Sequence, residues 1–146
     1  MQVDFYQLGG ASLEQVIASI AEKLIDQGGR LVIVAEDEAA LARLDRLLWG
    51  EQGDSRFLPH GISGGTDDTR QPILLSTSPD APNLARNILI ADGKWREAAL
   101  SFDRAFYLFD GNELDEARLA WKLLAGREGV ERRYWARADG KWKQQA

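Results

Sequence analysis

The chain has 146 residues, close to the commonest size of a single domain, and its 45% hydrophobic and 28% charged residues are ordinary globular values. It contains no cysteine and one histidine, which excludes disulfides, thiolate-bound metals and any site that needs two imidazoles. The net charge of −5 argues against a domain that binds duplex nucleic acid through an overall basic face. We expect one domain over residues 1–146, no membrane span, no cofactor and a cytoplasmic location.

The first half of the sequence alternates strand patterns with helix patterns. Apolar runs and helical spacing predict strands over 3–8 and 30–35 and helices over 13–25 and 38–49. Ser12 and Asp37 precede the two helices as capping residues, and the apolar run over 30–35 is typical of a strand that is buried on both faces. Residues 50–71 are rich in Gly, Asp, Ser and Thr, so we expect a long connection there. This order of elements favours parallel crossover units.

The second half continues in the same manner. Short apolar runs predict strands over 73–76, 87–91 and 105–109, a short helix over 95–102, a helix over about 113–125 and a final extended segment over 131–138. Gly126 closes the last helix, and a polar tail follows the extended segment. The pattern as a whole predicts an α/β fold with a mostly parallel sheet and flanking helices.

The last 29 residues reverse the sign of the charge. They hold three acidic side chains and eight basic ones, so the segment carries +5 while the rest of the chain carries −10. The basic residues are Arg118, Lys122, Arg127, Arg132, Arg133, Arg137, Lys141 and Lys143. Three of the five tryptophans, Trp121, Trp135 and Trp142, lie in the same segment. Such a segment suits a ligand that is both acidic and apolar.

Three patterns of catalytic or metal-binding residues are better explained as structural features. Residues 61–65 match the G-x-S-x-G motif of a serine hydrolase, but Pro59 and His60 precede the motif and no histidine follows it, which favours a loop around Ser63. His60 has no obvious orienting partner in the sequence, so we expect a structural hydrogen bond. The acidic run over 36–38 suits a helix N-terminus, and the absence of a G-x-x-x-x-G-K-[ST] motif disfavours nucleotide binding.

Two stretches of the sequence resemble the chi subunit of bacterial DNA polymerase III. The first comprises residues 44–49 (LDRLLW) and 57–60 (FLPH), which are similar to the L-D-x-x-L-W and F-x-P-H pattern of that family. The second comprises residues 117–122 (ARLAWK) with Gly129, which is similar to a helix with arginine, aromatic and lysine positions. The likeness covers nearly the full chain. It implies a three-layer Rossmann-like fold, similar to that of P-loop NTPases but without the phosphate loop, and no catalytic activity of its own.

The resemblance also implies a function and a set of binding residues. Members of the family associate with the clamp loader and bind the acidic, Phe-terminated C-terminal tail of single-stranded DNA-binding protein. By position, Arg118, Trp121 and Lys122 correspond to tail-binding residues, and Tyr107 stands where the family has another apolar residue. Leu114 occupies a position that is basic in some members, so one cationic contact is absent here.

The first of the two stretches, residues 44–49 and 57–60, implies a contact with a second protein. Trp49, Phe57 and Pro59 map onto positions that the family uses against its psi partner, which tethers chi to the clamp loader. The same three residues could instead pack beneath the loop over 50–71.

Two other interpretations of the C-terminal segment remain open from the sequence. In one, Trp121 belongs to the core, and Arg118 and Lys122 form a solvated helix face. In the other, the segment binds single-stranded nucleic acid directly, with tryptophans stacking on bases between basic side chains. That second interpretation uses Trp135, Trp142, Arg132, Arg133, Arg137 and Lys141. A socket formed jointly by Arg118, Trp121 and Lys122 would favour tail binding.

Overall fold

The computed structural model describes residues 1–51 and 56–146 and contains eight strands and three α-helices in these ranges. The strands are β1 (Gln2–Gln7), β2 (Leu31–Val34), β3 (Gly61–Ile62), β4 (Ile73–Ser76), β5 (Asn87–Ile90), β6 (Arg104–Phe109), β7 (Glu131–Ala138) and β8 (Lys141–Gln144). The helices are α1 (Leu13–Asp26), α2 (Glu38–Leu48) and α3 (Leu114–Leu124), with 3₁₀ turns at Asp68–Arg70, Glu97–Ser101 and Gly111–Glu113.

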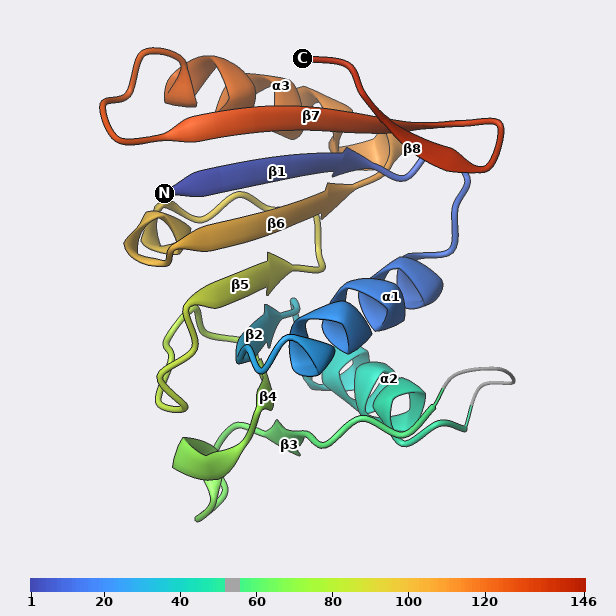
Figure 1. Ribbon diagram of the computed structural model, residues 1–146, viewed down its shortest axis with the longest axis vertical. Helices are drawn as coiled ribbons and strands as arrows, with labels where there is room; N and C mark the ends of the chain where they lie inside the picture. Colours follow the sequence, from blue (N-terminus) through green and yellow to red (C-terminus); the bar gives the residue numbers. More distant parts are fainter. Residues whose placement is uncertain (52–55) are drawn as a thin grey trace.

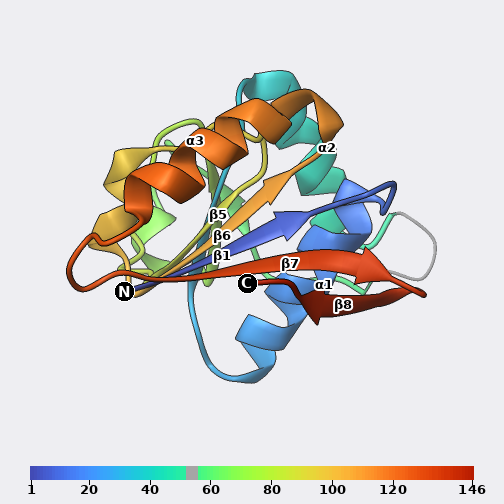
Figure 2. The ribbon, with the colours of Figure 1, turned by 90° about the horizontal axis from the view of Figure 1, so that it is seen from above.

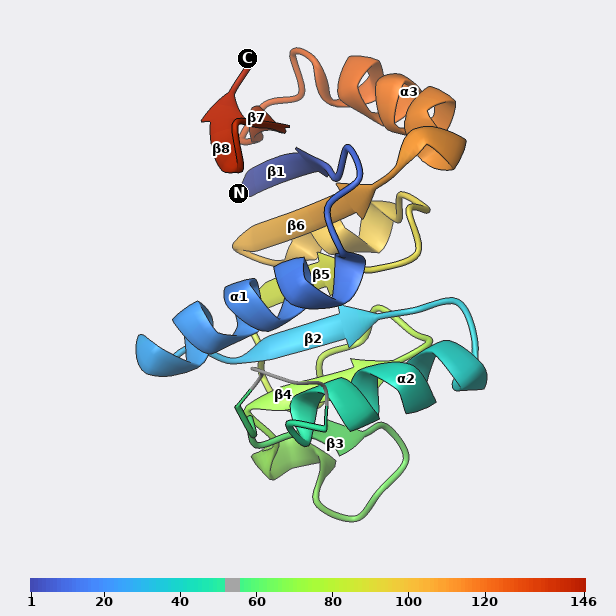
Figure 3. The ribbon, with the colours of Figure 1, turned by 90° about the vertical axis from the view of Figure 1, so that its right-hand side faces the viewer.

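All eight strands form one sheet in the order β3-β4-β2-β5-β6-β1-β7-β8 (Figure 1). In the described chain every neighbouring pair is parallel except β7 and β8, which form an antiparallel hairpin. The α1 and α2 helices pack on one face of the sheet, and α3 packs on the opposite face (Figures 2 and 3). The predicted mixed α/β fold with a mostly parallel sheet and flanking helices is confirmed.

The predicted elements agree with the structure except at three places. The segment over 95–102 contains a five-residue 3₁₀ helix and no α-helix. Two strands were not predicted: β3 has only two residues, and β8 has the polar sequence KWKQ. The hairpin turn before β8 does have a sequence signal, because Asp139 and Gly140 both adopt positive φ, 53° and 73°, and Asp-Gly is typical of tight hairpin turns.

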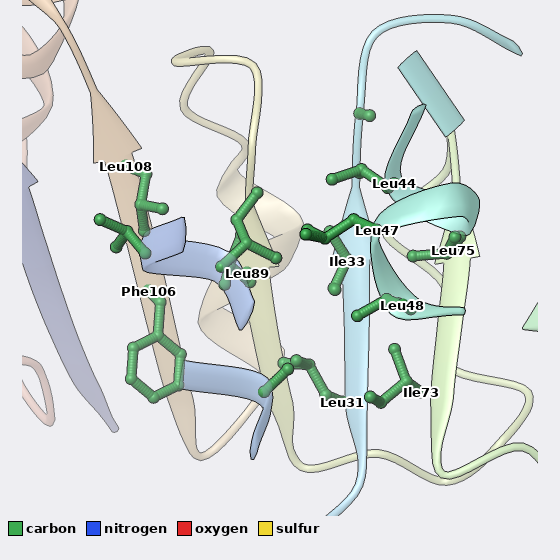
Figure 4. Close-up of a cluster of buried hydrophobic side chains, with 14 of the residues drawn as sticks. Leu31, Ile33, Leu44, Leu47, Leu48, Ile73, Leu75, Leu89, Phe106 and Leu108 are labelled. Atoms are coloured by element: carbon green, nitrogen blue, oxygen red, sulfur yellow. The ribbon is translucent and has the colours of Figure 1, made fainter. Parts of the chain in front are cut away.

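Two apolar clusters hold the helices to the sheet. Figure 4 shows the cluster on the α1 and α2 side, where leucines of α2 meet Ile33 of β2 and Leu75 of β4. The predicted caps hold these helices at their N-termini, since Ser12 accepts a hydrogen bond from the Gln15 amide at 3.3 Å and Asp37 accepts one from Ala40 at 2.9 Å. The second cluster joins α3 to β1, β5 and β6.

Strand β1 connects the two faces of the C-terminal half of the sheet. It pairs in parallel with β6 on one side and β7 on the other, so Phe5 lies level with Tyr107 and Tyr134. Because side chains alternate along a strand, Phe5 points toward α3 while Asp4 and Tyr6 point toward the α1 side. On that second side no described helix lies over β7 and β8 (Figure 3).

Asp4 is a fully buried carboxylate that the sequence did not reveal. It accepts hydrogen bonds from the Gln2 side-chain amide at 2.8 Å, from Arg104 Nε at 2.8 Å and from the Trp135 indole at 3.0 Å. These three donors come from β1, β6 and β7, so the carboxylate ties three neighbouring strands together. A buried carboxylate is tolerated only with partners of this kind.

The buried position of Asp4 gives a stability prediction. We expect Asp4→Ala to lower the free energy of unfolding by about 2–3 kcal/mol, because Arg104 and Trp135 lose their acceptor. The matched control is Asp103→Ala, which removes a carboxylate from an exposed pair with Arg86 and should cost at most about 1 kcal/mol. Urea unfolding followed by circular dichroism measures both. Equal losses for the two variants would contradict the stabilising role of Asp4.

Candidate functional site

One flank of α3 faces strand β7 and carries three of the four residues that the sequence placed in the tail-binding site. Ala117, Ala120 and Leu124 form the buried face of the helix. Arg118, Trp121 and Lys122 are three and four residues apart, so they project from one side of the helix. Trp121 is half-buried, whereas Arg118 and Lys122 are exposed. The structure therefore brings the three predicted side chains to one flank.

The Trp121 indole is wedged between the core and a basic side chain. Its ring meets Phe5 edge-on at 5.1 Å and Tyr134 edge-on at 5.6 Å. The Arg132 guanidinium lies 3.9 Å from the indole centroid, and its Nη1 donates a hydrogen bond to the Trp121 carbonyl at 2.6 Å. This cation–π arrangement fixes a guanidinium beside the indole. Trp121 is thus neither a sealed core residue nor a freely exposed one.

The cations on this flank have no carboxylate partners. Within residues 1–51 and 56–146, neither Arg118, Lys122 nor Arg132 forms an ion pair with an acidic side chain. Burial raises the pKa of Tyr134, and the charge of nearby Arg118 partly offsets that rise. Tyr134 donates a hydrogen bond from its hydroxyl to Gln7 Oε1 at 2.7 Å. The flank therefore presents uncompensated positive charge around two aromatic rings.

Tyr107 lies elsewhere. It is fully buried, its hydroxyl donates to the Gly93 carbonyl at 2.6 Å, and its ring packs against Phe5 at 5.4 Å. Burial and the charge of Glu116 raise the pKa of Tyr107 well above its usual range. Gly93 has φ +73° and packs so closely on Glu113 that a Cβ would overlap it. The structure does not bring Tyr107 to the surface of the flank.

Two residues of β7 complete the flank. Sequence reasoning considered Arg132 only for nucleic-acid binding and did not consider Tyr134. Strand alternation is the signal that could have found them, because Arg132 and Tyr134 point to one face of the sheet while Trp135 and Arg137 point to the other. The residues proposed for nucleic-acid binding are accordingly divided. The strand register places Arg132 and Lys141 on the α3 side and Arg133, Trp135, Arg137 and Trp142 on the α1 side.

A second exposed surface lies at the end of α2. Trp49 is 56% exposed and Phe57 is 50% exposed, and their rings stack with centroids 5.0 Å apart. Pro59 beside them is also exposed. Leu58 is buried and its amide donates to the Leu48 carbonyl at 2.7 Å, which anchors the segment to the helix. The structure thus leaves about half of each of these two aromatic side chains exposed.

His60 is held by two hydrogen-bonding partners. Its Nε2 lies 2.7 Å from Asp45 Oδ1, and its Nδ1 lies 2.7 Å from the Leu58 carbonyl. The expected structural hydrogen bond is confirmed. Asp45 orients His60, but it was not obvious from the sequence, because it lies fifteen residues earlier on α2 and only the fold brings it close.

The G-x-S-x-G match lies in a loop, as expected. Ser63 directly follows the edge strand β3, and its amide donates to the Leu75 carbonyl at 2.8 Å. The amides of Gly64 and Gly65 donate to the carboxylate of Asp68. No described α-helix follows this serine directly, so the strand–turn–helix geometry of a nucleophile elbow is absent there.

Acidic side chains near the ends of β2 and β5 are already partnered. Glu36 pairs with Lys94 at 2.6 Å, and Asp92 pairs with Arg96 at 2.7 Å. Among the described residues, no group of three or more His, Asp or Glu side chains is arranged to hold a metal ion. No helix in the described ranges is both long and apolar enough to cross a membrane.

The fold and these surfaces define an α/β protein with a mostly parallel sheet. It has a basic aromatic surface on the flank of α3 and an exposed aromatic pair at the end of α2. The family model described as DNA polymerase III chi subunit, HolC, matches residues 1–131, and the chain belongs to this family. It is similar to the protein named DNA polymerase III subunit chi of Escherichia coli strain K12, with 31% identity over 83 residues. That match spans 57% of this chain and 56% of the relative, so it covers about half of each. The family resemblance in the sequence is confirmed.

The two tryptophans allow a direct comparison of buried and exposed aromatic surface. We expect Trp121→Ala to lower the free energy of unfolding by about 2 kcal/mol or more, because the indole packs on Phe5 and Tyr134. Trp49→Ala removes the same side chain from an exposed position and should cost less than about 1 kcal/mol. Chemical unfolding of both variants measures the difference. A Trp49 variant as unstable as the Trp121 variant would show that the exposed pair belongs to the core.

Proposed function

We propose that the chain is a non-catalytic accessory subunit of a bacterial DNA polymerase III holoenzyme, acting in DNA replication. In this proposal it associates with the clamp loader and binds the acidic, Phe-terminated tail of single-stranded DNA-binding protein. Residues 1–146 would act as one Rossmann-like domain without a phosphate loop. Family membership supports the replication role. The observation that carries the tail-binding role is the set of cations around the half-buried Trp121, namely Arg118, Lys122 and Arg132, which have no acidic partner among the described residues.

The chemistry of the flank suits such a tail. Guanidinium and ammonium groups donate charge-assisted hydrogen bonds to carboxylates, including the terminal one. Arg132 keeps donors free beyond the one that it gives to the Trp121 carbonyl, because a guanidinium has five N–H groups. Tyr134 and Trp121 offer ring surface for a terminal phenylalanine. Peptide capture by a local cluster of cations is a recurring mode of recognition.

Arg132 also supplies a cation to the flank, which lacks a basic side chain at Leu114. The helix lacks a basic side chain at that position, so α3 alone offers two cations on this flank, Arg118 and Lys122. Arg132 from β7 supplies a third, held in place by the indole of Trp121. The proposed socket therefore depends on a strand residue as well as on the helix.

The net charge of the chain does not prevent capture of an acidic tail. The Debye length is about 10 Å at 0.1 M salt, so most of the acidic side chains elsewhere are screened from the flank. Contacts within hydrogen-bonding distance are screened less. We therefore expect an affinity of roughly micromolar strength that weakens as salt increases.

Titration with a synthetic acidic peptide that ends in phenylalanine tests the proposal. We expect Arg118→Glu and Lys122→Glu each to weaken binding by about tenfold or more, because each replaces an attractive charge with a repulsive one. Removal of the terminal phenylalanine should have an effect of similar size. Fluorescence anisotropy of a labelled peptide measures these affinities.

The matched control is Arg43→Glu, the same change on an exposed position of α2. It should alter peptide affinity by less than about twofold, since it lies outside the flank. Equal weakening by Arg43→Glu and Arg118→Glu would mean that only the total charge matters. No binding of either peptide to the unmodified protein would refute the tail-binding role.

We also propose that Trp49, Phe57 and Pro59 contact a psi partner that joins the chain to the clamp loader. The support is the exposed, stacked pair of rings, since aromatic residues dominate the energetics of protein interfaces. The pair lies at the end of α2, so this contact would leave the α3 flank free.

The partner contact has its own test. We expect Trp49→Ala and Phe57→Ala each to weaken binding to a purified psi subunit by about tenfold or more, while peptide affinity stays unchanged. Leu84→Ala, which truncates another exposed apolar side chain, serves as the control. Biosensor binding measures the partner affinity. Full affinity in both aromatic variants would place the partner contact elsewhere.

A further inference from the structure

The α1 side of the C-terminal strands carries a row of aromatic rings. Phe106 of β6, Tyr6 of β1 and Trp135 of β7 lie side by side, with centroid distances of 6.3 and 6.2 Å and interplanar angles of 25° and 12°. Trp142 of β8 meets Tyr6 edge-on at 5.0 Å. The row therefore crosses three neighbouring strands, and the hairpin adds a fourth ring over it.

Polar contacts inside the row hold it in place. Asp4 accepts hydrogen bonds from Trp135 and Arg104, and the Arg104 guanidinium lies 4.4 Å from the centroid of Phe106. Burial and the Asp4 charge raise the pKa of Tyr6, while Arg104 opposes that rise. Phe106 is buried, whereas Tyr6, Trp135 and Trp142 are partly exposed. These three rings form a preorganised surface, because their neighbours already fix their positions.

Two adjoining hollows lie between this row and helix α1. The larger has a volume of about 270 Å³ and extends from Tyr6 and Trp142 to hydroxyl and amide side chains of α1 and its cap. The smaller has a volume of about 170 Å³ and lies over Phe106 and Arg104. Both are lined by Tyr6, Ile20 and Lys23, so they run side by side along the helix.

The charge around the hollows is positive. Lys23, Arg104 and Arg137 are among the lining residues and no described aspartate or glutamate is, although Arg104 is paired with the buried Asp4 at 2.8 Å. Within residues 1–51 and 56–146, Lys23 and Arg137 form no ion pair. The Arg137 guanidinium lies 5.2 Å from the centroid of Trp142. An anionic ligand with a flat ring would meet unpaired cations and an aromatic wall together.

We propose that this face binds single-stranded nucleic acid, with a base stacked on Trp142 and the phosphate backbone held by Arg137 and Lys23. Bases stack on aromatic side chains regardless of sequence, and phosphates bind the flanking cations. The hydroxyl and amide groups of Ser12, Ser19 and Gln15 can reach base edges or sugar oxygens. Duplex nucleic acid does not suit the site, because its bases are already stacked within the helix.

This site is separate from the flank of α3. It uses the opposite faces of the same strands, β1 and β7, so an acidic tail and a nucleic-acid strand could bind together. Its proposed contacts Arg137 and Trp142 lie beyond residue 131, where the family match ends, whereas Lys23 and the other lining residues lie within the match. The inference therefore stands independently of the proposed tail-binding function.

The test uses fluorescein-labelled oligothymidylate and oligouridylate of about 15 nucleotides, with anisotropy as the readout. At low salt we expect binding of at least one of them. With roughly two phosphate contacts, affinity should fall about 25-fold for each tenfold rise in salt. Trp142→Ala and Arg137→Glu should each weaken binding by about tenfold or more.

The matched control lies on the same hairpin. Lys143 is the neighbour of Trp142 on β8 and points to the opposite face, so Lys143→Glu makes a similar charge change away from the hollows. We expect less than about a twofold effect from it. Equal weakening by Arg137→Glu and Lys143→Glu, or full affinity in Trp142→Ala, would overturn the proposal, as would failure of both oligonucleotides to bind.

The tail peptide separates the two proposals. Arg137→Glu should keep its peptide affinity, and Lys122→Glu should keep its oligonucleotide affinity. Loss of both affinities in Arg137→Glu would indicate damage to the fold and would remove the support for a separate site. Oligonucleotide binding with the expected variant pattern, in a protein that does not bind the peptide, would refute the proposed function alone. Displacement of the oligonucleotide by the peptide would contradict a separate site.

Discussion

The alternation of side chains along β1 is the constraint on which both surfaces of the C-terminal half depend. Because β1 lies between β6 and β7 in register with both, every second side chain reaches a different layer. On one side Phe5 contacts five other rings, Trp95, Tyr107, Phe109, Trp121 and Tyr134. On the other side Asp4 binds donors from β6 and β7, and Tyr6 lies between Phe106 and Trp135. A change in β1 would therefore disturb both surfaces at once.

Pairing of charges explains how a chain with a net charge of −5 can present basic surfaces. Several acidic side chains are engaged locally: Asp37 caps a helix, Asp92 binds Arg96, and Asp4 is buried among its donors. Arg118 and Lys122, by contrast, have no acidic partner in the described ranges. At physiological ionic strength, such local arrangements govern contacts with a ligand more than the total charge does.

The sequence predicts those parts of the fold that depend on local patterns. Apolar patterns located the three α-helices and six of the eight strands of the described ranges, and the caps at Ser12 and Asp37 were correct. Strand β8 was missed because its polar sequence has no strand pattern, although the Asp-Gly turn before it was a usable signal. Asp45 and His60, and likewise Asp4 and Trp135, meet only through the tertiary fold, so local patterns could not pair them. Tyr107 is buried because helices or loops cover both faces of β6.

The candidate site shows the same division between local and tertiary information. Arg118, Trp121 and Lys122 share a flank because helical spacing requires it, and residues 117–122 lie within the family match. Their strand partners Arg132 and Tyr134 lie beyond that match and are defined by the register of β7. Treating the basic C-terminal segment as one surface combined residues that point in opposite directions, since Arg132 and Arg133 are neighbours in sequence but face different layers. Once residues 131–138 are assigned to a strand, the alternation of side chains alone separates the residues that face α3 from those that face α1. Each group can then be matched to its own ligand chemistry.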